Sequence, residues 1–473
     1  MPNQNEIQLL QQIHDKVIDY LMYHDGVVVN PHPTPKDIYK FMNLDLGQPN
    51  ELEDIRMIID KYLAYAVRTD SPNFYNQLFS GFSPLGYIGE VIAALTNSSM
   101  YTFEMSPIAT MIEKKLINKM SKLVGYEKGF GTFVTGGSNS NLVAMLSARH
   151  KTCPISKTNG LFEQRQLVAF VSEESHYSFV KAGYQIGIGT DQIRKVPCDQ
   201  TGHMDTIALR SMINNSIANG QKPFFVAATA GTTVRGIFDP INEIADICDD
   251  FELWLHIDGS WGGSVILSKN HKHLLDGCER SDSFTWCCHK MMGIPLICTA
   301  LLLKDKQILK LINEVKGTEY LFHDDDDNEL DLGRFSLQCG RKVESIKLWL
   351  TWKYFGDSGY EKKINHLFQL ANYSEIKVKK SSILKLISPV ESLNICFQPQ
   401  PEQLHETEWN NFTISVRDKL IHDGHVMVNY AYIGSTCCIR LITVNFEQEK
   451  KHLDSFFNIV EETSYKILNK YIS

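Results

Sequence analysis

The chain has 473 residues, of which 43% are hydrophobic and 22% charged, and its formal net charge at pH 7 is −8. This is the composition of an ordinary globular protein, long enough for one large α/β domain with smaller additions, and it excludes a disordered chain. Lysines and arginines are scattered rather than clustered, so we expect no nucleic-acid partner.

The first 70 residues predict a helical arm. The segment begins polar and continues amphipathic, which is typical of neither a signal peptide nor a membrane span. We therefore expect a cytoplasmic protein without membrane contact, whose arm packs its apolar face against a partner subunit or the main domain. That face is formed by residues three or four apart: Ile7, Leu10, Ile13, Val17 and Leu21.

A second helix is predicted over residues 106–125. Ser106 is a candidate N-cap, Pro107 occupies the first helical position, and Gly125 ends the pattern. One apolar stripe is expected along it, formed by Ile108, Met111, Ile112, Leu116, Met120 and Leu123.

Between about residues 130 and 305, short apolar runs alternate with helical segments. Runs at 167–172, 224–231 and 253–258 predict buried strands, and residues 241–251 predict a helix. Strand, helix and strand in this order indicate right-handed βαβ units and a largely parallel sheet. Ligands bind such sheets at the carboxyl ends of the strands, so functional residues should follow these runs.

The remaining segments complete the expected domain organisation. Residues 71–360 would form a large domain, and residues 361–473 a small α+β domain with strand-like runs "HVMVNY" and "CCIRLITV". The acidic stretch at 323–331 reads as a solvated loop, because no glycine lies among its aspartates to make a calcium-binding turn.

Two residues indicate chemistry. Asp258 ends the apolar run "LWLHID", and Lys290 stands in "SDSFTWCCHKMMG". Pyridoxal 5′-phosphate enzymes need such a pair, because a lysine amine condenses with the cofactor's aldehyde while a carboxylate keeps its pyridine nitrogen protonated. Taken singly, either residue would more often be a surface charge.

Three further segments could complete a cofactor site. Gly136, Gly137 and Ser138 separate a strand at 131–135 from a helix beginning near Asn139, so helix N–H groups could cradle a phosphate. His176 could stack on a planar ring, and Thr233 could donate a hydroxyl hydrogen bond. Each also has an ordinary structural reading as a turn, a cap or a core residue.

Several collinear blocks resemble one family, the group II pyridoxal phosphate-dependent amino acid decarboxylases, and within it the glutamate and cysteine sulfinate branch. The similarity extends from about residue 70 to the C-terminus and includes "NFYNQLFSG", "GGSNSNLVAMLSAR", "SEESHYSFVKAG", "LWLHIDGSWGG", "TWCCHKMMG" and "LQCGRKVESIKLWLTWK". The resemblance implies a fold-type-I α/β architecture with an N-terminal arm, a large cofactor domain and a small C-terminal domain. It also implies a homodimer with its site near the subunit interface.

The resemblance assigns roles to individual residues. Lys290 would bond to the cofactor, Asp258 would pair with the pyridine nitrogen, and His176 would stack on the ring. Tyr320 of "TEYLF" would return a proton to the substrate's α-carbon from a mobile flap, which excludes water. The remaining cofactor contacts would come from Gly137, Ser138, His289 and Thr233.

Substrate contacts follow from the same resemblance. Arg440 would hold the substrate's carboxylate. Gln77, Phe79 and Ser99 match positions that line the side-chain pocket, and the bulky Phe79 favours a short acid such as cysteine sulfinate or aspartate. Glutamate, diaminobutyrate or aromatic amino acids stay open as alternative substrates.

Two positions depart from the family pattern. Cys287 stands where relatives carry small or polar residues, and a thiol is a poor hydrogen-bonding partner for phosphate. Gly259 replaces an alanine next to Asp258. A catalytically silent scaffold or a Cys/His metal protein is a further alternative, but adjacent cysteines lack the Cys-x2–4-Cys spacing of zinc sites, so we expect no metal.

Overall fold

The computed structural model describes residues 2–22, 27–162, 164–318, 320–322 and 329–472. The chain packs into two compact units. The large unit comprises Phe82–Asn372 and Ser388–Ile395. The second unit comprises Met1–Gly81, Tyr373–Ile387 and Cys396–Ser473.

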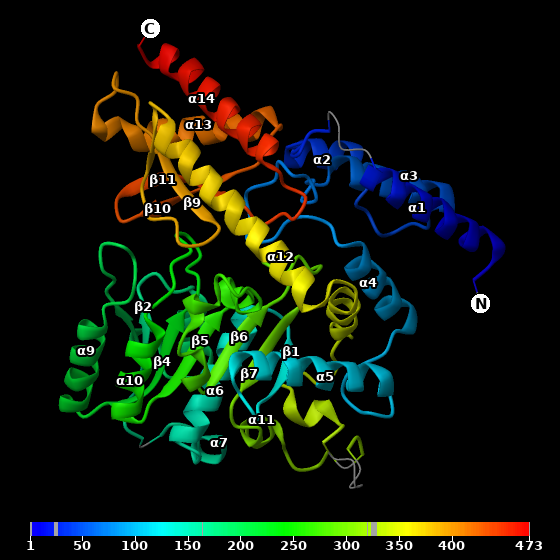
Figure 1. Ribbon diagram of the computed structural model, residues 1–473. Coiled ribbons are helices and arrows are strands. Elements are labelled where there is room, and N and C mark those ends of the chain that lie inside the picture. Colours follow the sequence, from blue (N-terminus) through cyan, green and yellow to red (C-terminus); the bar gives the residue numbers. More distant parts are fainter. Residues whose placement is uncertain (1, 23–26, 163, 319, 323–328, 473) are drawn as a thin grey trace. The chain divides into compact units, whose positions relative to one another are not determined.

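The large unit contains a seven-stranded sheet in the order β1-β7-β6-β5-β4-β2-β3 (Figure 1). Strands β3, β2, β4, β5 and β6 run parallel, whereas β7 is antiparallel to both β6 and β1. This confirms the predicted, largely parallel sheet of an α/β fold. The strands are β1 (Phe130–Val134), β2 (Leu167–Ser172), β3 (Ile193–Val196), β4 (Lys222–Thr229), β5 (Trp254–Gly259), β6 (Ser283–Cys287) and β7 (Thr299–Leu303).

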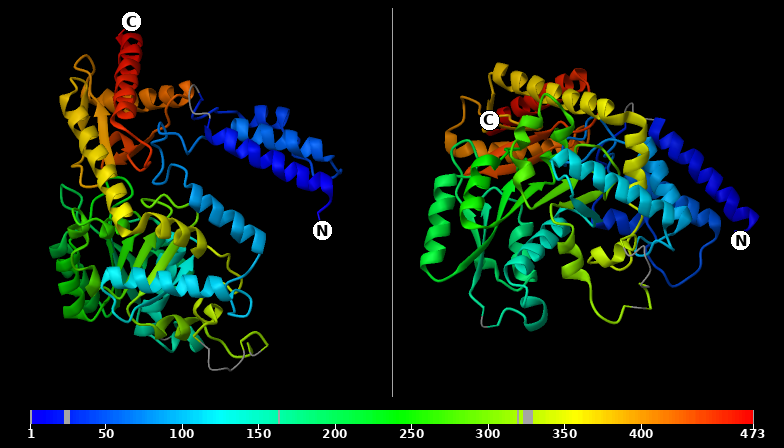
Figure 2. Two further views of the ribbon diagram at one scale, coloured as in Figure 1. Left: turned by 45° about the vertical axis from the view of Figure 1, so that its right-hand side comes forward. Right: turned by 60° about the horizontal axis from the view of Figure 1, so that its bottom comes forward.

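Helices pack against this sheet, as the two views of Figure 2 show. All six residues of β2 and of β5 are buried, which explains why these strands read as continuous apolar runs. The helices are α4 (Pro84–Thr96), α5 (Pro107–Val124), α6 (Gly137–Thr152), α7 (Ser156–Asn159), α8 (Ser178–Gln185), α9 (Thr206–Ala218), α10 (Ile241–Phe251), α11 (Gln307–Asn313) and the first part of α12 (Ser345–Lys380).

Short 3₁₀ turns connect several of these elements: η1 (Thr190–Gln192), η2 (Gly262–Leu267), η3 (Lys272–Leu275), η4 (Cys278–Arg280) and η5 (Leu332–Phe335). Helix α12 is interrupted at Gly356, whose φ of 61° lies in the left-handed region.

Helix α5 has the predicted bounds, but its predicted apolar stripe is only partly right. Ile108 and Met111 are 77% and 52% exposed. The buried face is instead centred further along the helix and includes Glu113, which is 1% exposed because it pairs with Arg341. A buried ion pair thus replaces part of the apolar stripe, and this pairing is invisible in the local sequence pattern.

The second unit combines helices with a four-stranded sheet in the order β10-β11-β9-β8. The strand predicted for residues 425–430 begins only at Asn429. The prediction is therefore wrong for residues 425–428, which precede the strand. The elements are α1 (Gln4–Met22), α2 (Pro35–Phe41), α3 (Leu52–Tyr65), β8 (Leu384–Leu386), β9 (Asn394–Pro399), η6 (Glu406–Glu408), α13 (Trp409–Asp423), β10 (Asn429–Ile433), β11 (Thr436–Ile442) and α14 (Lys450–Ile472).

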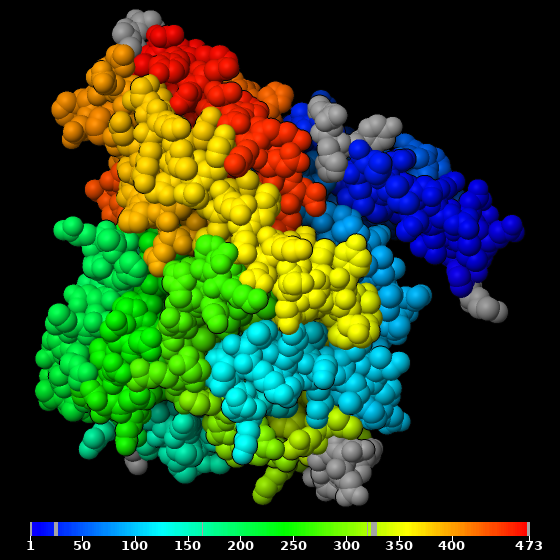
Figure 3. Space-filling view, in the orientation of Figure 1, coloured from blue at the N-terminus to red at the C-terminus, as the bar shows by residue number. Residues whose placement is uncertain are grey.

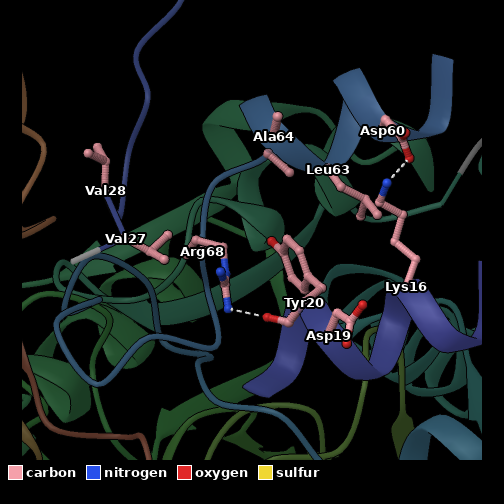
Figure 4. A pocket seen from close by; sticks show the side chains of 10 residues that line it. Lys16, Asp19, Tyr20, Val27, Val28, Asp60, Leu63, Ala64 and Arg68 are labelled. Carbon is pink, nitrogen blue, oxygen red and sulfur yellow. Dashed lines mark hydrogen bonds and ion pairs between the residues drawn. The ribbon is translucent and has the colours of Figure 1, made fainter. Parts of the chain in front are cut away.

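Polar contacts hold the helices of the N-terminal arm (Figure 4). Lys16 of α1 forms an ion pair with Asp60 of α3. Arg68 donates from Nη2 to the carbonyl oxygen of Tyr20 at 2.8 Å, and its guanidinium lies 3.9 Å from the centroid of the Tyr20 ring. These side chains line a cavity of about 410 Å³. Within the described ranges, no helix is long and apolar enough to cross a membrane.

Candidate active site

Four predicted site residues lie in or just after neighbouring strands of the large unit. Asp258 belongs to β5, while His176, Thr233 and Lys290 follow β2, β4 and β6. These four strands are parallel, so their carboxyl ends lie at one edge of the sheet. The fold therefore brings the predicted carboxylate, imidazole, hydroxyl and amine to the same edge.

Asp258 is a buried carboxylate, only 4% exposed. Its Oδ2 accepts a hydrogen bond from Asn141 Nδ2 at 2.9 Å, and its Oδ1 accepts one from the Ser260 backbone N–H at 3.1 Å. Burial opposes ionisation, but hydrogen bonding from Ser260 and Asn141, with the positive charge of Lys290, keeps the pKa of Asp258 below its ordinary value. The carboxylate is therefore held in its charged form.

Lys290 lies in a tight turn beyond β6. Its N–H donates to the Cys287 carbonyl at 3.2 Å, and its own carbonyl accepts from the Gly293 N–H at 3.0 Å. Its side chain is half-buried and its charge acts on both Asp258 and His176. Lys290 thus brings one amino group to the edge of the sheet where the parallel strands end.

His176 is the third charged or titratable group of this cluster. Its Nδ1 accepts from the Ser178 N–H at 3.3 Å. Burial lowers the pKa of His176, the charge of Lys290 lowers it further, and Asp258 opposes both. The imidazole is therefore neutral at neutral pH, which suits a group that stacks on a ring.

The first turn of α6 lies against the ends of β5 and β6. A Cβ atom added at Gly137 would stand 2.5 Å from Ser260 Oγ and 3.3 Å from Cys287 Sγ, so the close approach favours glycine. Ser138 is exposed beside it. The N-terminus of α6 offers backbone N–H groups and positive partial charge to an anion at this edge.

His289 precedes Lys290 and is 8% exposed. Its Nδ1 faces the backbone of Cys298, 3.0 Å from the carbonyl oxygen and 3.1 Å from the amide nitrogen. Burial lowers the pKa of His289 to about 4, so the ring is neutral near pH 7. Cys298 thus fixes the orientation of the imidazole.

One positioning residue that the sequence reasoning missed is Asn394. Its Nδ2 donates to the carbonyl oxygens of Thr233 and Val234 at 3.1 and 2.9 Å. Its Oδ1 accepts from Trp261 Nε1 at 2.8 Å. Asn394 therefore ties the loop after β4 to the segment after β5, and its distance in sequence left no local signal.

Asn141 and His256 were also missed, and both belong to the polar network around Asp258. For His256 a signal existed, because it stands two residues before Asp258 in β5 and so faces the same side of the sheet. Asn141 lies within the predicted helix after the glycine turn, where its role depends on tertiary contacts alone.

Three of the predicted substrate residues lie in the second unit. Arg440 is 7% exposed and donates from Nη2 to the Asn76 carbonyl at 2.8 Å. Gln77 Nε2 donates to Asn76 Oδ1 at 2.8 Å. The ring of Phe79 lies 6.5 Å from that of Phe74. Gln77 and Arg440 therefore both contact Asn76.

The remaining two predicted residues lie in the large unit. Ser99 Oγ accepts from the Arg341 N–H at 3.3 Å. Tyr320 is 80% exposed in a turn. Residues 323–328 of the predicted acidic loop lie outside the described residues.

The doublet Cys287-Cys288 is buried, and burial raises the pKa of both thiols. Cys287 Sγ accepts from Thr299 Oγ1 at 3.2 Å. All eleven cysteines lie in the described part of the chain and are thiols, nine of them buried. In that same part, no three His, Cys, Asp or Glu side chains are arranged to hold a metal ion.

The donor set fits pyridoxal phosphate. Lys290 offers an amine for an aldehyde, and the charged, buried Asp258 offers an acceptor for a protonated ring nitrogen. The glycine-lined start of α6 offers the N–H groups that a phosphate requires. These three functions meet where the parallel strands end.

The amino-acid sequence is similar to those of known pyridoxal-dependent decarboxylases. The model of the pyridoxal-dependent decarboxylase conserved domain matches residues 35–400. Cysteine sulfinic acid decarboxylase of Homo sapiens is 37% identical over 443 residues, which cover 90% of this chain and 89% of the relative. Acidic amino acid decarboxylase GADL1 of Mus musculus is 36% identical over 440 residues, covering 90% and 80% of the two chains.

A solved structure extends the likeness to the fold. The crystal structure of mouse CSAD superposes with a TM-score of 0.94 at 34% identity, covering 98% of this chain and 99% of the other. The expected fold-type-I architecture is thereby confirmed. The chain belongs to the pyridoxal-dependent decarboxylases, enzymes that use pyridoxal phosphate as cofactor.

Proposed function

We propose that this enzyme removes the α-carboxylate of a small acidic amino acid, of the cysteine sulfinate and aspartate type. The observation that carries the chemistry is the meeting of the Lys290 amine and the ionised Asp258 at one sheet edge. The substrate class is supported by the printed activities of the relatives, a cysteine sulfinic acid decarboxylase and an acidic amino acid decarboxylase.

In this proposal each residue has one task. Lys290 would hold the cofactor through its amine, and Asp258 would keep the ring nitrogen protonated. His176 stacks on the ring, and Thr233 lies beside it. Gly137, Ser138 and His289 bind the phosphate. When bound, pyridoxal phosphate supplies an electron sink for the bond that breaks.

Tyr320 is proposed as the proton donor to the α-carbon after carbon dioxide leaves. Tyr320 stands in an exposed turn, and a flap that carries it would close over the substrate. Closing the site would exclude water and limit competing reactions.

Arg440 is proposed to bind a substrate carboxylate. Its guanidinium is buried and its Nη2 donates to the Asn76 carbonyl. A planar guanidinium suits a carboxylate, because it can donate two parallel hydrogen bonds. Phe79, with Gln77 and Ser99, would limit the length of the side-chain pocket. A bulky ring at position 79 favours the shorter acids over glutamate.

We also propose a cytoplasmic homodimer with residues 1–70 as a dimerisation arm, 71–360 as the cofactor domain and 361–473 as the small domain. Thiols rather than disulfides support a reducing compartment. Exposed apolar side chains support subunit contact, and α5, which bears two of them, lies on the face seen in Figure 3. On α4 and α5 they are Ile88, Val91, Leu95, Ile108 and Met111.

The role of Lys290 can be tested by borohydride reduction. Wild-type protein incubated with pyridoxal phosphate should retain the cofactor covalently after reduction, as measured by the protein's mass. Lys290→Ala should not. Lys181→Ala is a matched control, because Lys181 also places its charge near His176 yet should keep the adduct. Retention of the adduct by Lys290→Ala would show that another lysine carries the cofactor.

A further inference from the structure

We propose that Asn141 and His256 are positioning residues that form a polarised hydrogen-bond relay, which fixes the orientation and charge of Asp258. The relay runs from Trp254 through Ser283, His256 and Asn141 to the carboxylate. This inference rests on the proposed pairing of Asp258 with the cofactor's ring nitrogen.

Asn141 is the centre of the relay, 1% exposed, and its amide uses its full hydrogen-bonding capacity. Its Nδ2 donates to Asp258 Oδ2 at 2.9 Å and to Ser178 Oγ at 3.0 Å. Its Oδ1 lies 3.1 Å from His256 Nε2 and accepts from Thr285 Oγ1 at 3.1 Å. A carboxylate only accepts, so the nitrogen of the Asn141 amide must face Asp258 and its oxygen must face His256.

This orientation determines the tautomer of His256. An acceptor oxygen at 3.1 Å requires a hydrogen on Nε2, because two lone pairs would otherwise face each other. Burial lowers the pKa of His256 to about 4, so the ring is neutral and Nδ1 has no hydrogen. Nδ1 therefore accepts from the hydroxyl of Ser283, 2.8 Å away.

The far end of the relay is fixed in the same direction. Trp254 Nε1, which can only donate, lies 2.8 Å from Ser283 Oγ. Aromatic rings exclude water from the middle of the relay, since the rings of Phe225 and Phe179 lie 5.8 and 6.1 Å from the His256 ring. A donor-only group at one end and an acceptor-only group at the other thus give every bond one direction, toward Asp258.

As a consequence, each of the two carboxylate oxygens of Asp258 is held by its own hydrogen bond. Asn141 holds Oδ2, while the Ser260 N–H holds Oδ1. Both donors favour the ionised form. Loss of the Asn141 donor should therefore weaken the attraction between Asp258 and a protonated ring nitrogen, and leave phosphate binding intact.

The test compares two ligands on apoprotein by fluorescence titration: pyridoxal phosphate, and its analogue with C–H in place of the ring nitrogen. Wild type should bind pyridoxal phosphate more tightly than the analogue. In Asn141→Ala that preference should fall by at least about tenfold, the effect of removing a hydrogen bond to a charged group. Analogue affinity should change less than about threefold, because only the nitrogen-dependent contact is lost.

A matched control and a rescue separate the relay from general damage. Ser178→Ala removes the other acceptor of Asn141 Nδ2 and should keep the wild-type preference. His256→Leu should reduce the preference, whereas His256→Gln, whose amide can donate to Asn141 and accept from Ser283, should restore most of it. This pair also decides the case if Asn141→Ala does not fold.

The outcomes distinguish the two claims. A wild-type preference that survives in Asn141→Ala or in His256→Leu refutes the relay alone. Equal loss of both ligands in these variants also refutes it, since it indicates a merely structural role. Equal affinity of wild type for both ligands refutes the pairing of Asp258 with the ring nitrogen, and the relay's function with it.

Discussion

The buried ion pair between Glu113 and Arg341 gives the sharpest stability prediction. Arg341 donates from Nη1 and Nη2 to the two carboxylate oxygens of Glu113 at 3.0 and 2.8 Å. The side chains are only 2% and 5% exposed, so removal of one leaves the other charged and out of water. Glu113→Leu alone, or Arg341→Met alone, should therefore lower the free energy of unfolding by about 3–5 kcal/mol.

The double variant should behave differently. With both charges replaced by apolar groups, no buried charge is left unpaired, and the loss should be smaller than in either single variant. Urea unfolding followed by circular dichroism measures all three. An exposed control pair is Lys119 and Asp357, with 37% and 60% exposed side chains, where Lys119→Met should cost less than about 1 kcal/mol.

Additive losses in the double variant, or single losses below about 1 kcal/mol, would refute this reasoning.

The backbone of Arg341 also contacts the segment that carries Ser99, a predicted substrate residue. The Arg341 N–H donates to Ser99 Oγ, and the Arg341 carbonyl accepts from the Met100 N–H at 2.9 Å. The single variants should therefore also disturb the segment that carries Ser99.

Three further predictions follow from single contacts. Gly259→Ala should cost about 1–3 kcal/mol in urea unfolding, because the new Cβ would lie 2.7 Å from the Phe284 ring and 2.8 Å from the Thr285 carbonyl oxygen; an unchanged midpoint would contradict this overcrowding. The pKa values of His256 and His289 are about 4 in the folded protein against 6.5 ordinarily, so the unfolded chain binds protons first and stability should fall from pH 6.5 to pH 4. The loss is up to about 3 kcal/mol per histidine, and it is opposed by Asp239, whose pKa burial raises to about 6. The test therefore compares wild type with His256→Gln, and an equal pH dependence of the two unfolding free energies would contradict the prediction. Phe79→Ser should raise kcat/KM for glutamate relative to cysteine sulfinate by about tenfold or more, with Phe79→Tyr as the bulky control; an unchanged ratio would exclude Phe79 from the pocket.

Much of the large unit was predictable because its strands are buried on both faces. The run at 167–172 and the helix at 241–251 have the predicted bounds. A parallel sheet also places the residues after its strands at one edge, which is why Asp258 and Lys290 could be associated from sequence.

The residues that the sequence did not reveal act across long separations. Asn394 holds the Thr233 loop, and Asn141 holds Asp258, through contacts that have no period or local motif. The predicted stripe of α5 failed for a related reason, since the buried face includes Glu113, whose partner Arg341 lies 228 residues away in sequence. Local patterns report burial, whereas these contacts depend on which elements the fold brings together.

The central claim is decarboxylation of a short acidic amino acid, and the most direct measurement is carbon dioxide release by purified enzyme with pyridoxal phosphate. The panel is cysteine sulfinate, aspartate, glutamate, diaminobutyrate and an aromatic amino acid. We predict the highest kcat/KM for cysteine sulfinate or aspartate, a lower value for glutamate, and little release from the others. A clear preference for a neutral or basic amino acid would contradict the proposed role of Arg440 and the substrate assignment.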